Sequence, residues 1–202
     1  MTTLYYLPGA CSLSPHIVLR EAGLAFDLDR VDRATQKTAS GKDYRTKNPL
    51  GYVPALELDD GTVLTEGPAI VQYIADQVPD RQLAPPAGTI ERYRLQSWLN
   101  LVTSELHKSF SPLFNPAMPE DTKNVFRERL LGRFGWVDQQ LAGRDYLMGD
   151  RFSVADAYLY VVSTWAPMSK LDLSGLANLA AFQARVRARP SVQAAMAAEG
   201  LK

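Results

Sequence analysis

The chain has 202 residues, of which 46% are hydrophobic and 22% are charged, and its 22 basic residues balance its 22 acidic ones. This neutral, ordinary globular composition argues against nucleic acid or an anionic membrane as the main partner. No apolar run approaches the ~18 residues that cross a bilayer and the N-terminus does not resemble a signal peptide, so we expect a cytoplasmic protein.

The first part of the chain alternates between strand and helix signals. Residues 4–7 are typical of a strand, and 15–22 of a helix with Ser12 or Ser14 as its N-cap. Residues 26–31 alternate like a second strand. The polar stretch 32–48 predicts an irregular segment with at most a short helix.

A hairpin is the clearest local signal. Two strand-like runs, 55–58 and 62–64, flank Asp59-Asp60-Gly61, and Asp-Gly between strands is a strong turn signature. Gly67-Pro68 then opens an apolar helix. The order strand, helix, strand, irregular segment, hairpin, helix predicts a thioredoxin-like α/β domain over residues 1–80.

From residue 90 onward the pattern becomes helical. Residues 81–89 predict a linker rich in proline, and apolar residues then recur at helical spacing around 95–110 and 126–141. Ser153-Val154-Ala155-Asp156 is a capping-box pattern with Asp in place of Glu. A further helix over 176–187 is expected to stop before Pro190. We therefore expect an all-helical second domain over 90–202.

Cys11 is the only cysteine and lies between the first strand and the first helix. Most free cysteines are small buried hydrophobes, which is one interpretation. The other is a reactive thiol, since a helix N-terminus favours thiolate over thiol. Ser14 stands where a dithiol oxidoreductase carries its second cysteine, so redox chemistry at Cys11 would need a thiol from outside.

Two short motifs could bind a peptide-like ligand. Val53-Pro54 precedes a strand, either as a rigid loop or as a tight turn whose Val53 backbone pairs with a ligand. At Glu66-Gly67 a helix begins, where free N–H groups bind carboxylates and Glu66 could pair with an ammonium group. The simpler interpretation is that Thr65 or Glu66 is only a helix cap.

Asn100, Ser104 and His107 fall within one stripe of a predicted helix, opposite its apolar face. Such a stripe usually faces solvent, but the helix follows the linker and the stripe could face the other domain. His107 would then be the titratable group nearest a thiolate there. His16 is interpreted as a packing residue. With two histidines and one cysteine, we expect no metal site.

These motifs together resemble the bacterial glutathione S-transferases, in particular the beta class. The resemblance extends over essentially the whole chain and is carried by five segments: 5–16, 51–56, 64–70, 104–108 and 152–157. It implies the glutathione transferase fold, with a thioredoxin-like domain followed by an all-helical domain. It also implies a homodimer.

The resemblance further implies glutathione as cosubstrate. The Val53 backbone, ahead of a cis-Pro54, would hold its cysteinyl part, and Glu66 with Gly67 its γ-glutamyl end. Cys11 and His107 would flank the glutathione sulfur.

Further residues at the edge of the site follow from the same resemblance. Asn100, Ser104 and Glu105 would lie there, some of them reaching it from the neighbouring subunit. Two positions depart from the family pattern. Gln36 stands where Lys often contacts the glycine carboxylate, unless Lys37 substitutes, and Gly67 stands where some members have Ser.

The expected reaction is transfer of the glutathione thiolate to a small electrophile, with Cys11, Ser12 and His107 as donors that stabilise the thiolate. A second route is a mixed disulfide between Cys11 and glutathione, giving thiol–disulfide exchange or peroxide reduction. Two alternatives remain open: a reductive dehalogenase of chlorinated ring-cleavage products, and a non-catalytic scaffold that binds ligands or partners.

Overall fold

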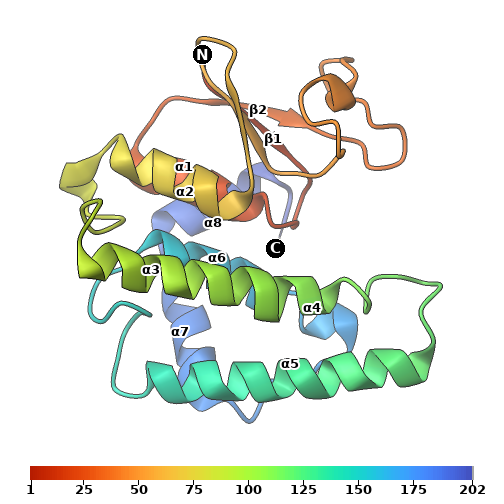
Figure 1. Ribbon diagram of the computed structural model, residues 1–202, viewed down its shortest axis with the longest axis vertical. Coiled ribbons are helices and arrows are strands. Elements are labelled where there is room, and N and C mark those ends of the chain that lie inside the picture. The colour runs from red at the N-terminus through yellow and green to blue at the C-terminus, as the bar shows by residue number, and fades with distance from the viewer. Residues whose placement is uncertain (202) are drawn as a thin grey trace. The chain divides into compact units, whose positions relative to one another are not determined.

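A computed structural model describes residues 1–201 of the chain (Figure 1). The chain forms two compact units. The first comprises Met1–Pro86 together with the segment that starts at Arg189, and the second is Ala87–Ala188. The predicted domains differ from this division at the C-terminus, because the last helix packs in the first unit.

The first unit is built on a four-stranded sheet with the order β2-β1-β3-β4. Its strands are β1 (Thr3–Tyr6), β2 (Asp27–Arg30), β3 (Ala55–Glu57) and β4 (Val63–Thr65). β1 pairs with β2 in parallel, whereas the β1–β3 and β3–β4 pairs are antiparallel. The predicted Asp-Gly turn joins β3 to β4, with Gly61 at φ +84°.

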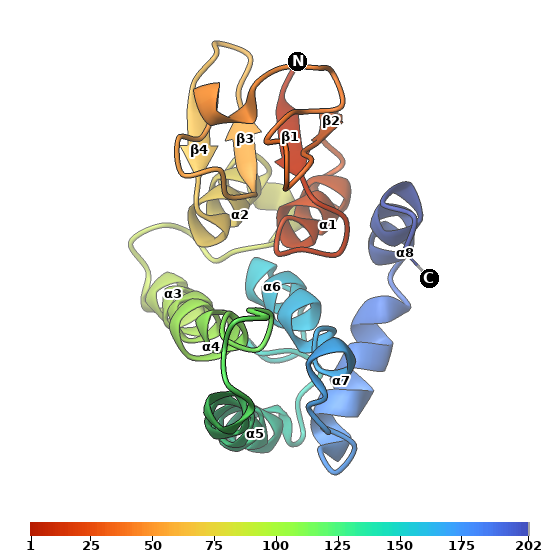
Figure 2. The same ribbon diagram turned by 90° about the vertical axis from the view of Figure 1, so that its right-hand side faces the viewer.

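Helices cover one face of this sheet. α1 (Leu13–Ala22) and α2 (Gly67–Asp76) lie side by side on it (Figure 2). The short 3₁₀ turn η2 (Pro79–Arg81) follows α2. Because neighbouring strand residues point to opposite faces, Leu4 and Tyr6 face the helices while Tyr5 faces the other way. The predicted thioredoxin-like arrangement is confirmed.

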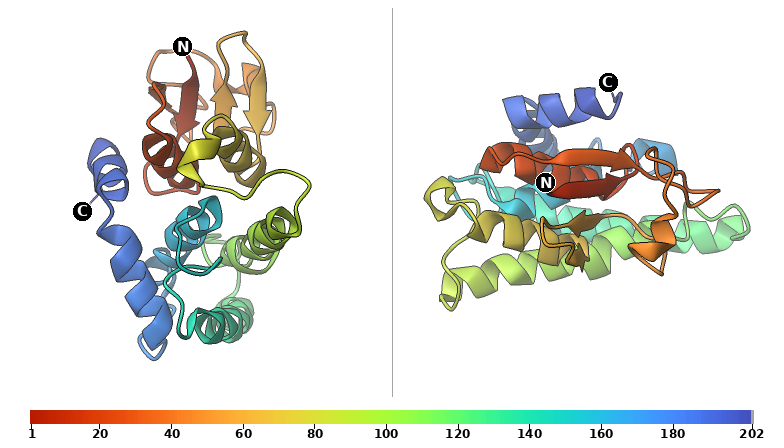
Figure 3. Two further views of the ribbon diagram at one scale, coloured as in Figure 1. Left: turned by 90° about the vertical axis from the view of Figure 1, so that its left-hand side faces the viewer. Right: turned by 90° about the horizontal axis from the view of Figure 1, so that it is seen from above.

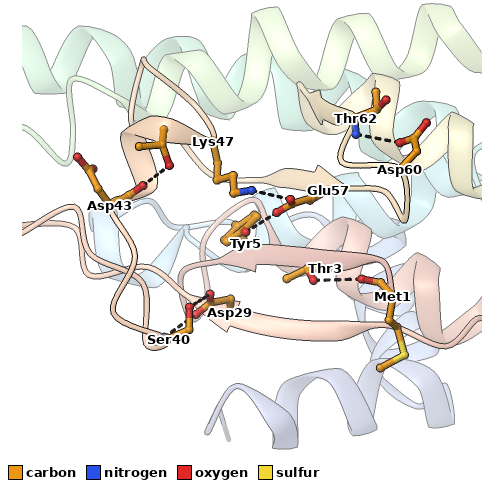
Figure 4. A network of polar contacts seen from close by, with 11 residues as sticks. Met1, Thr3, Tyr5, Asp29, Ser40, Asp43, Lys47, Glu57, Asp60 and Thr62 are labelled. Carbon is orange, nitrogen blue, oxygen red and sulfur yellow. Dashed lines mark hydrogen bonds and ion pairs between the residues drawn. The ribbon is translucent and has the colours of Figure 1, made fainter.

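The irregular segment 32–48 covers the opposite face of the sheet. It contains the 3₁₀ turn η1 (Tyr44–Thr46), and the Tyr44 ring packs on Tyr5 with centroids 5.4 Å apart. The Tyr5 hydroxyl donates to Glu57 at 2.6 Å, and Lys47 binds the same carboxylate at 2.5 Å (Figure 4). These contacts hold the loop that leads to Val53 against the sheet.

α8 (Pro190–Ala198) completes the first unit by packing against α1 (Figure 3). The sequence predicts that the preceding helix stops before Pro190 and does not predict a helix after it. In the structure Pro190 is the first residue of α8, a position where its missing N–H costs nothing. Arg189, just before it, binds Glu21 of α1 through Nε at 2.5 Å.

The second unit is all-helical, as predicted. α3 (Ile90–Leu101) continues without a break through the π-helical turn η3 (Val102–His107) into α4 (Lys108–Phe110). The other elements are α5 (Glu120–Leu141), α6 (Val154–Ser163), the 3₁₀ turn η4 (Pro167–Ser169) and α7 (Ala177–Arg187). All ten residues of α6 are buried, so this helix forms the core of the unit.

The predicted capping box at the start of α6 is confirmed. Asp156 accepts hydrogen bonds from the Ser153 backbone N–H at 2.8 Å and from the Ser153 hydroxyl at 2.7 Å. It also accepts the Leu147 N–H at 2.8 Å. Complete burial raises the pKa of Asp156 to about 6.

Candidate active site

Cys11 lies in the loop between β1 and α1, two residues before the first residue of the helix. Its thiol donates to the backbone carbonyl of Val53 at 3.2 Å, and its side chain is partly exposed. The loop turns at Gly9, whose φ of +70° suits glycine. Cys11 is therefore accessible and is held beside the loop that precedes β3.

Ser12, predicted as a thiolate donor, is buried, and its hydroxyl is used within the loop. Its Oγ accepts the Leu7 N–H and donates to the Leu7 carbonyl, both at 3.1 Å. It occupies the N-cap position of α1 without capping the helix through its side chain. In this arrangement Ser12 shapes the turn that carries Cys11.

The peptide bond between Val53 and Pro54 is cis. The preceding carbonyl, that of Tyr52, accepts two side-chain hydrogen bonds, from the Tyr44 hydroxyl at 2.6 Å and from Asn48 Nδ2 at 2.7 Å. Both donors are buried. They fix the backbone immediately before the carbonyl that faces the Cys11 thiol.

The N-terminus of α2 lies next to Pro54. A Cβ built on Gly67 would be 3.9 Å from Pro54 Cγ, so the helix start and the cis-proline are neighbours. Glu66 is the exposed N-cap residue and has a φ of +66°. This backbone conformation is unfavourable for any residue other than glycine. The first unit thus brings together a thiol, a fixed peptide edge and a helix N-terminus.

Gln36 does not extend freely into solvent. Its Nε2 donates to the Arg33 carbonyl at 3.0 Å, and its Oε1 is buried without a partner. That oxygen would lie only 2.5 Å from a Cβ on Gly51. Lys37, the possible substitute, is exposed.

In the second unit, His107 is the last residue of η3. Its Nδ1 lies 2.7 Å from the Tyr158 hydroxyl, and its ring meets the edge of Trp165 with centroids 4.9 Å apart. Burial and the charge of Lys108 lower the pKa of His107 to about 4. The ring is therefore neutral at physiological pH.

The predicted polar stripe only partly exists. Asn100 and Ser104 are exposed, and the Ser104 hydroxyl donates to the Asn100 carbonyl at 2.9 Å. His107 instead packs into the unit, because the π-helical turn changes the rotation of the residues that follow it. Glu105 is bound by Arg129 at 3.1 Å and by Arg133 at 2.8 Å, which lowers its pKa.

An aromatic cluster adjoins His107. Phe110, Phe114 and Trp165 lie within 6.0 Å of one another by ring centroid. Phe110 is completely buried, whereas Phe114 is 42% exposed. The second unit therefore presents aromatic surface close to a neutral imidazole.

A buried network that the sequence does not predict supports the Cys11 loop. Glu199, after α8, accepts the Gly9 N–H at 2.9 Å and lies 2.8 Å from His16 Nδ1. Arg20 Nε donates to His16 Nε2 at 3.0 Å. His16 is thus a packing residue, as predicted, but with polar partners on both ring nitrogens. The distance in sequence between His16 and Glu199 left no local signal.

Comparison with known proteins identifies the family. The family model for the glutathione S-transferase N-terminal domain matches residues 9–77, and that for the C-terminal domain matches residues 101–190. Glutathione S-transferase GstA from Escherichia coli O157:H7 is 51% identical over 98% of this chain and 99% of its own length. The chain belongs to the glutathione S-transferase family.

Two solved structures extend this assignment. The chain is similar to the bacterial beta-class glutathione S-transferase of Sphingomonas chungbukensis, at 50% identity and a TM-score of 0.96 over 99% of this chain and 100% of that one. A sphingomonad glutathione S-transferase complexed with glutathione is 48% identical, with a TM-score of 0.96 over the same shares. The expected transferase activity, beta-class resemblance and fold are confirmed.

Within residues 1–201, no group of three or more His, Cys, Asp and Glu side chains is arranged to hold a metal ion. Over the same residues, no helix is both long and apolar enough to span a bilayer.

Proposed function

We propose that this transferase binds glutathione in its first unit, with the cysteinyl sulfur next to Cys11, and joins the thiolate to small hydrophobic electrophiles. The observation that carries the proposal is the Cys11 thiol, 3.2 Å from the Val53 carbonyl beside cis-Pro54. A peptide N–H of glutathione would donate to the Val53 carbonyl in place of the Cys11 thiol. The thiol would then be available to the glutathione sulfur. The solved relative that holds glutathione supports this role.

The γ-glutamyl end of glutathione carries both a carboxylate and an ammonium group. The N-terminus of α2 at Gly67 suits the carboxylate, because helix N–H groups and the helix dipole attract anions. The exposed Glu66 carboxylate suits the ammonium group. Gly67 and Pro54 are neighbours, which supports a γ-glutamyl contact close to the cysteinyl contact.

In conjugation, the glutathione thiolate attacks the electrophilic carbon, and the leaving group departs with its bonding electrons. A free thiol has a pKa of about 8.5, so the site must stabilise the thiolate. Cys11 and His107 are the proposed donors. Ser12 contributes indirectly, since its hydroxyl already donates to Leu7.

Further residues would contact glutathione away from its sulfur. Gln36 or Lys37 would approach the glycine carboxylate. The outer edge of the site would be formed by Asn100, Ser104 and Glu105.

Exposure of the lone cysteine favours a second activity, thiol–disulfide exchange. The Cys11 thiolate attacks the glutathionyl sulfur of a mixed disulfide RSSG and expels RS⁻. A second glutathione thiolate then attacks the same sulfur, forms oxidised glutathione and releases the Cys11 thiolate. Conjugation uses Cys11 as a neighbour of the reacting sulfur, whereas exchange uses it as the nucleophile.

Replacement of Cys11 separates the two activities. In Cys11→Ala and Cys11→Ser variants, we expect glutathione-dependent disulfide reduction to disappear, because both lack the thiol. Conjugation of an aryl halide should fall by about tenfold in Cys11→Ala, the cost of one lost hydrogen bond to an anion, and by less in Cys11→Ser, whose hydroxyl can still donate. Disulfide reduction that survives intact would exclude Cys11 as nucleophile. A wild-type protein that conjugates no electrophile in a broad panel would contradict the main proposal, and activity on chlorinated ring-cleavage products alone would favour a dehalogenase.

We further propose that the working form is a cytoplasmic homodimer. The support for this proposal is that the chain belongs to the glutathione S-transferase family. Sedimentation of the purified protein at micromolar concentration tests the assembly, with a dimer expected and a monomer contradicting it.

A further inference from the structure

The contact between His107 and Tyr158 decides how the imidazole can be used. Tyr158 lies in α6, is 3% exposed and is surrounded by the core of the second unit, so its hydroxyl has a fixed position. The wide turn of η3, closed by a bond from the Lys108 N–H to the Thr103 carbonyl, brings His107 Nδ1 to 2.7 Å from that hydroxyl. Within residues 87–188, His107 Nε2 has no hydrogen-bond partner.

The direction of this hydrogen bond follows from the acidity of the two groups. A phenol has a pKa of about 10 and is a far stronger donor than the N–H of a neutral imidazole. The unprotonated imidazole nitrogen is in turn a better acceptor than a phenol oxygen. The O–H of Tyr158 therefore donates to Nδ1, and the single proton of the neutral ring belongs on Nε2.

We propose that Tyr158 is a positioning residue that holds His107 as its Nε2–H tautomer, so that the ring presents a permanent hydrogen-bond donor to the glutathione thiolate. This inference rests on the proposed function for the identity of the thiolate. The tautomer itself depends only on contacts inside the second unit.

A neutral donor differs from an acid–base catalyst in its consequences. Because burial lowers the pKa of His107 to about 4, the ring keeps the same protonation state throughout the range in which the glutathione thiolate forms. The edge-on contact with Trp165, 4.9 Å between centroids, fixes the plane of the ring from a second side. His107 then stabilises the thiolate without exchanging a proton with it.

Nitrogen-15 NMR of the free protein tests the tautomer directly, because protonated and unprotonated ring nitrogens have well-separated shifts. The chain has only two histidines, and a His107→Asn variant assigns them. We expect an unprotonated shift at His107 Nδ1 and a protonated shift at Nε2. The opposite pattern in the wild-type protein would overturn the proposal.

His16 provides an internal reference. Arg20 donates to its Nε2 at 3.0 Å, so a neutral His16 must carry its proton on Nδ1, where Glu199 accepts it. The two histidines are therefore expected to be opposite tautomers in one spectrum. Replacing Tyr158 should change only the His107 signals.

Tyr158→Phe removes the hydroxyl and keeps the ring, and Tyr160→Phe, at another buried tyrosine of α6, is the matched control. In Tyr158→Phe we expect loss of the pure Nε2–H tautomer and a kcat for conjugation about five- to tenfold lower, the worth of one oriented hydrogen bond. Tyr160→Phe should leave both the tautomer and kcat unchanged.

Unchanged His107 shifts in Tyr158→Phe would overturn the proposal even if activity fell. A wild-type protein with the expected tautomer but without glutathione chemistry would contradict the proposed function only.

Discussion

Ser12 and Ser14 are both buried at the start of α1, yet their hydroxyl groups have different surroundings. Ser12 Oγ exchanges two hydrogen bonds with the Leu7 backbone, whereas Ser14 Oγ has no partner. We expect Ser12→Ala to lower the free energy of unfolding by about 1 kcal/mol, because the part-buried Leu7 N–H loses the Ser12 hydroxyl as its acceptor and the Leu7 carbonyl keeps only the Ala10 N–H. Ser14→Ala should be neutral or stabilising. Urea unfolding measures both, and equal losses in the two variants would contradict this account.

His107 makes stability depend on pH. Its pKa is lowered to about 4 in the folded protein from 6.5, so the unfolded chain binds more protons between these values. Stability from this group is complete above pH 6.5 and is lost as the pH falls toward 4, by about 3 kcal/mol at 1.36 kcal/mol per pKa unit.

A His107→Asn variant lacks this titration. The difference in unfolding free energy between wild type and variant should therefore shrink between pH 6.5 and pH 4, as measured by urea unfolding at several pH values. A difference that stays constant over this window would show that His107 titrates normally in the folded protein.

The residues nearest to Cys11 could be predicted, because their signals are local. A cysteine after a strand and a breaker pair, and a proline directly before a strand, both mark loops in the sequence itself. The partner of His107 could not be predicted, since Tyr158 is 51 positions away in a helix that is otherwise apolar. Nothing in its surroundings distinguishes it from a core tyrosine.

At the scale of elements, the loop between β2 and β3 depends on one backbone carbonyl that accepts two side-chain hydrogen bonds. Tyr52 O accepts from Tyr44 and from Asn48, so either donor alone still satisfies it. We expect Tyr44→Phe and Asn48→Ala each to cost about 1 kcal/mol, and the double variant to cost more than their sum. Double-mutant unfolding measurements check this coupling, and simple additivity would contradict a shared role.

The hairpin and the long helices could be predicted, because turn residues and apolar periodicity are patterns of residues that are close together in the sequence. Two elements were not. The π-helical turn η3 interrupts a helical pattern without any breaker residue, so periodicity alone predicts a regular helix across it. α8 is rich in alanine and has little periodicity, and its first residue, Pro190, serves equally as a helix start or a helix stop.

At the scale of the whole molecule, one buried carboxylate strengthens the packing of the C-terminal segment in the first unit. Glu199 and His16 are both completely buried at the side chain, and Glu199 also accepts the Gly9 N–H of the Cys11 loop. We expect Glu199→Ala to lower the free energy of unfolding by about 3–5 kcal/mol, because it leaves buried donors unpaired. Glu199→Gln should lose less, since one acceptor oxygen remains.

The urea midpoint of the two Glu199 variants measures this effect. Glu120→Ala is a suitable control, because the Glu120 carboxylate binds Arg127 but its side chain is 62% exposed. A Glu199→Ala variant as stable as that control would contradict the role of the carboxylate. The sequence could not predict this link, since it joins residues 183 positions apart.

In our proposal, the first unit holds glutathione with its sulfur beside Cys11. Because Cys11 is the only cysteine, the intact mass of the protein after brief incubation with oxidised glutathione reports on this site alone. We predict one glutathione adduct per chain, formed much faster than an adduct from the disulfide of cysteine, which lacks the γ-glutamyl and glycyl groups. No adduct in the wild-type protein, or equal rates with the two disulfides, would contradict the account.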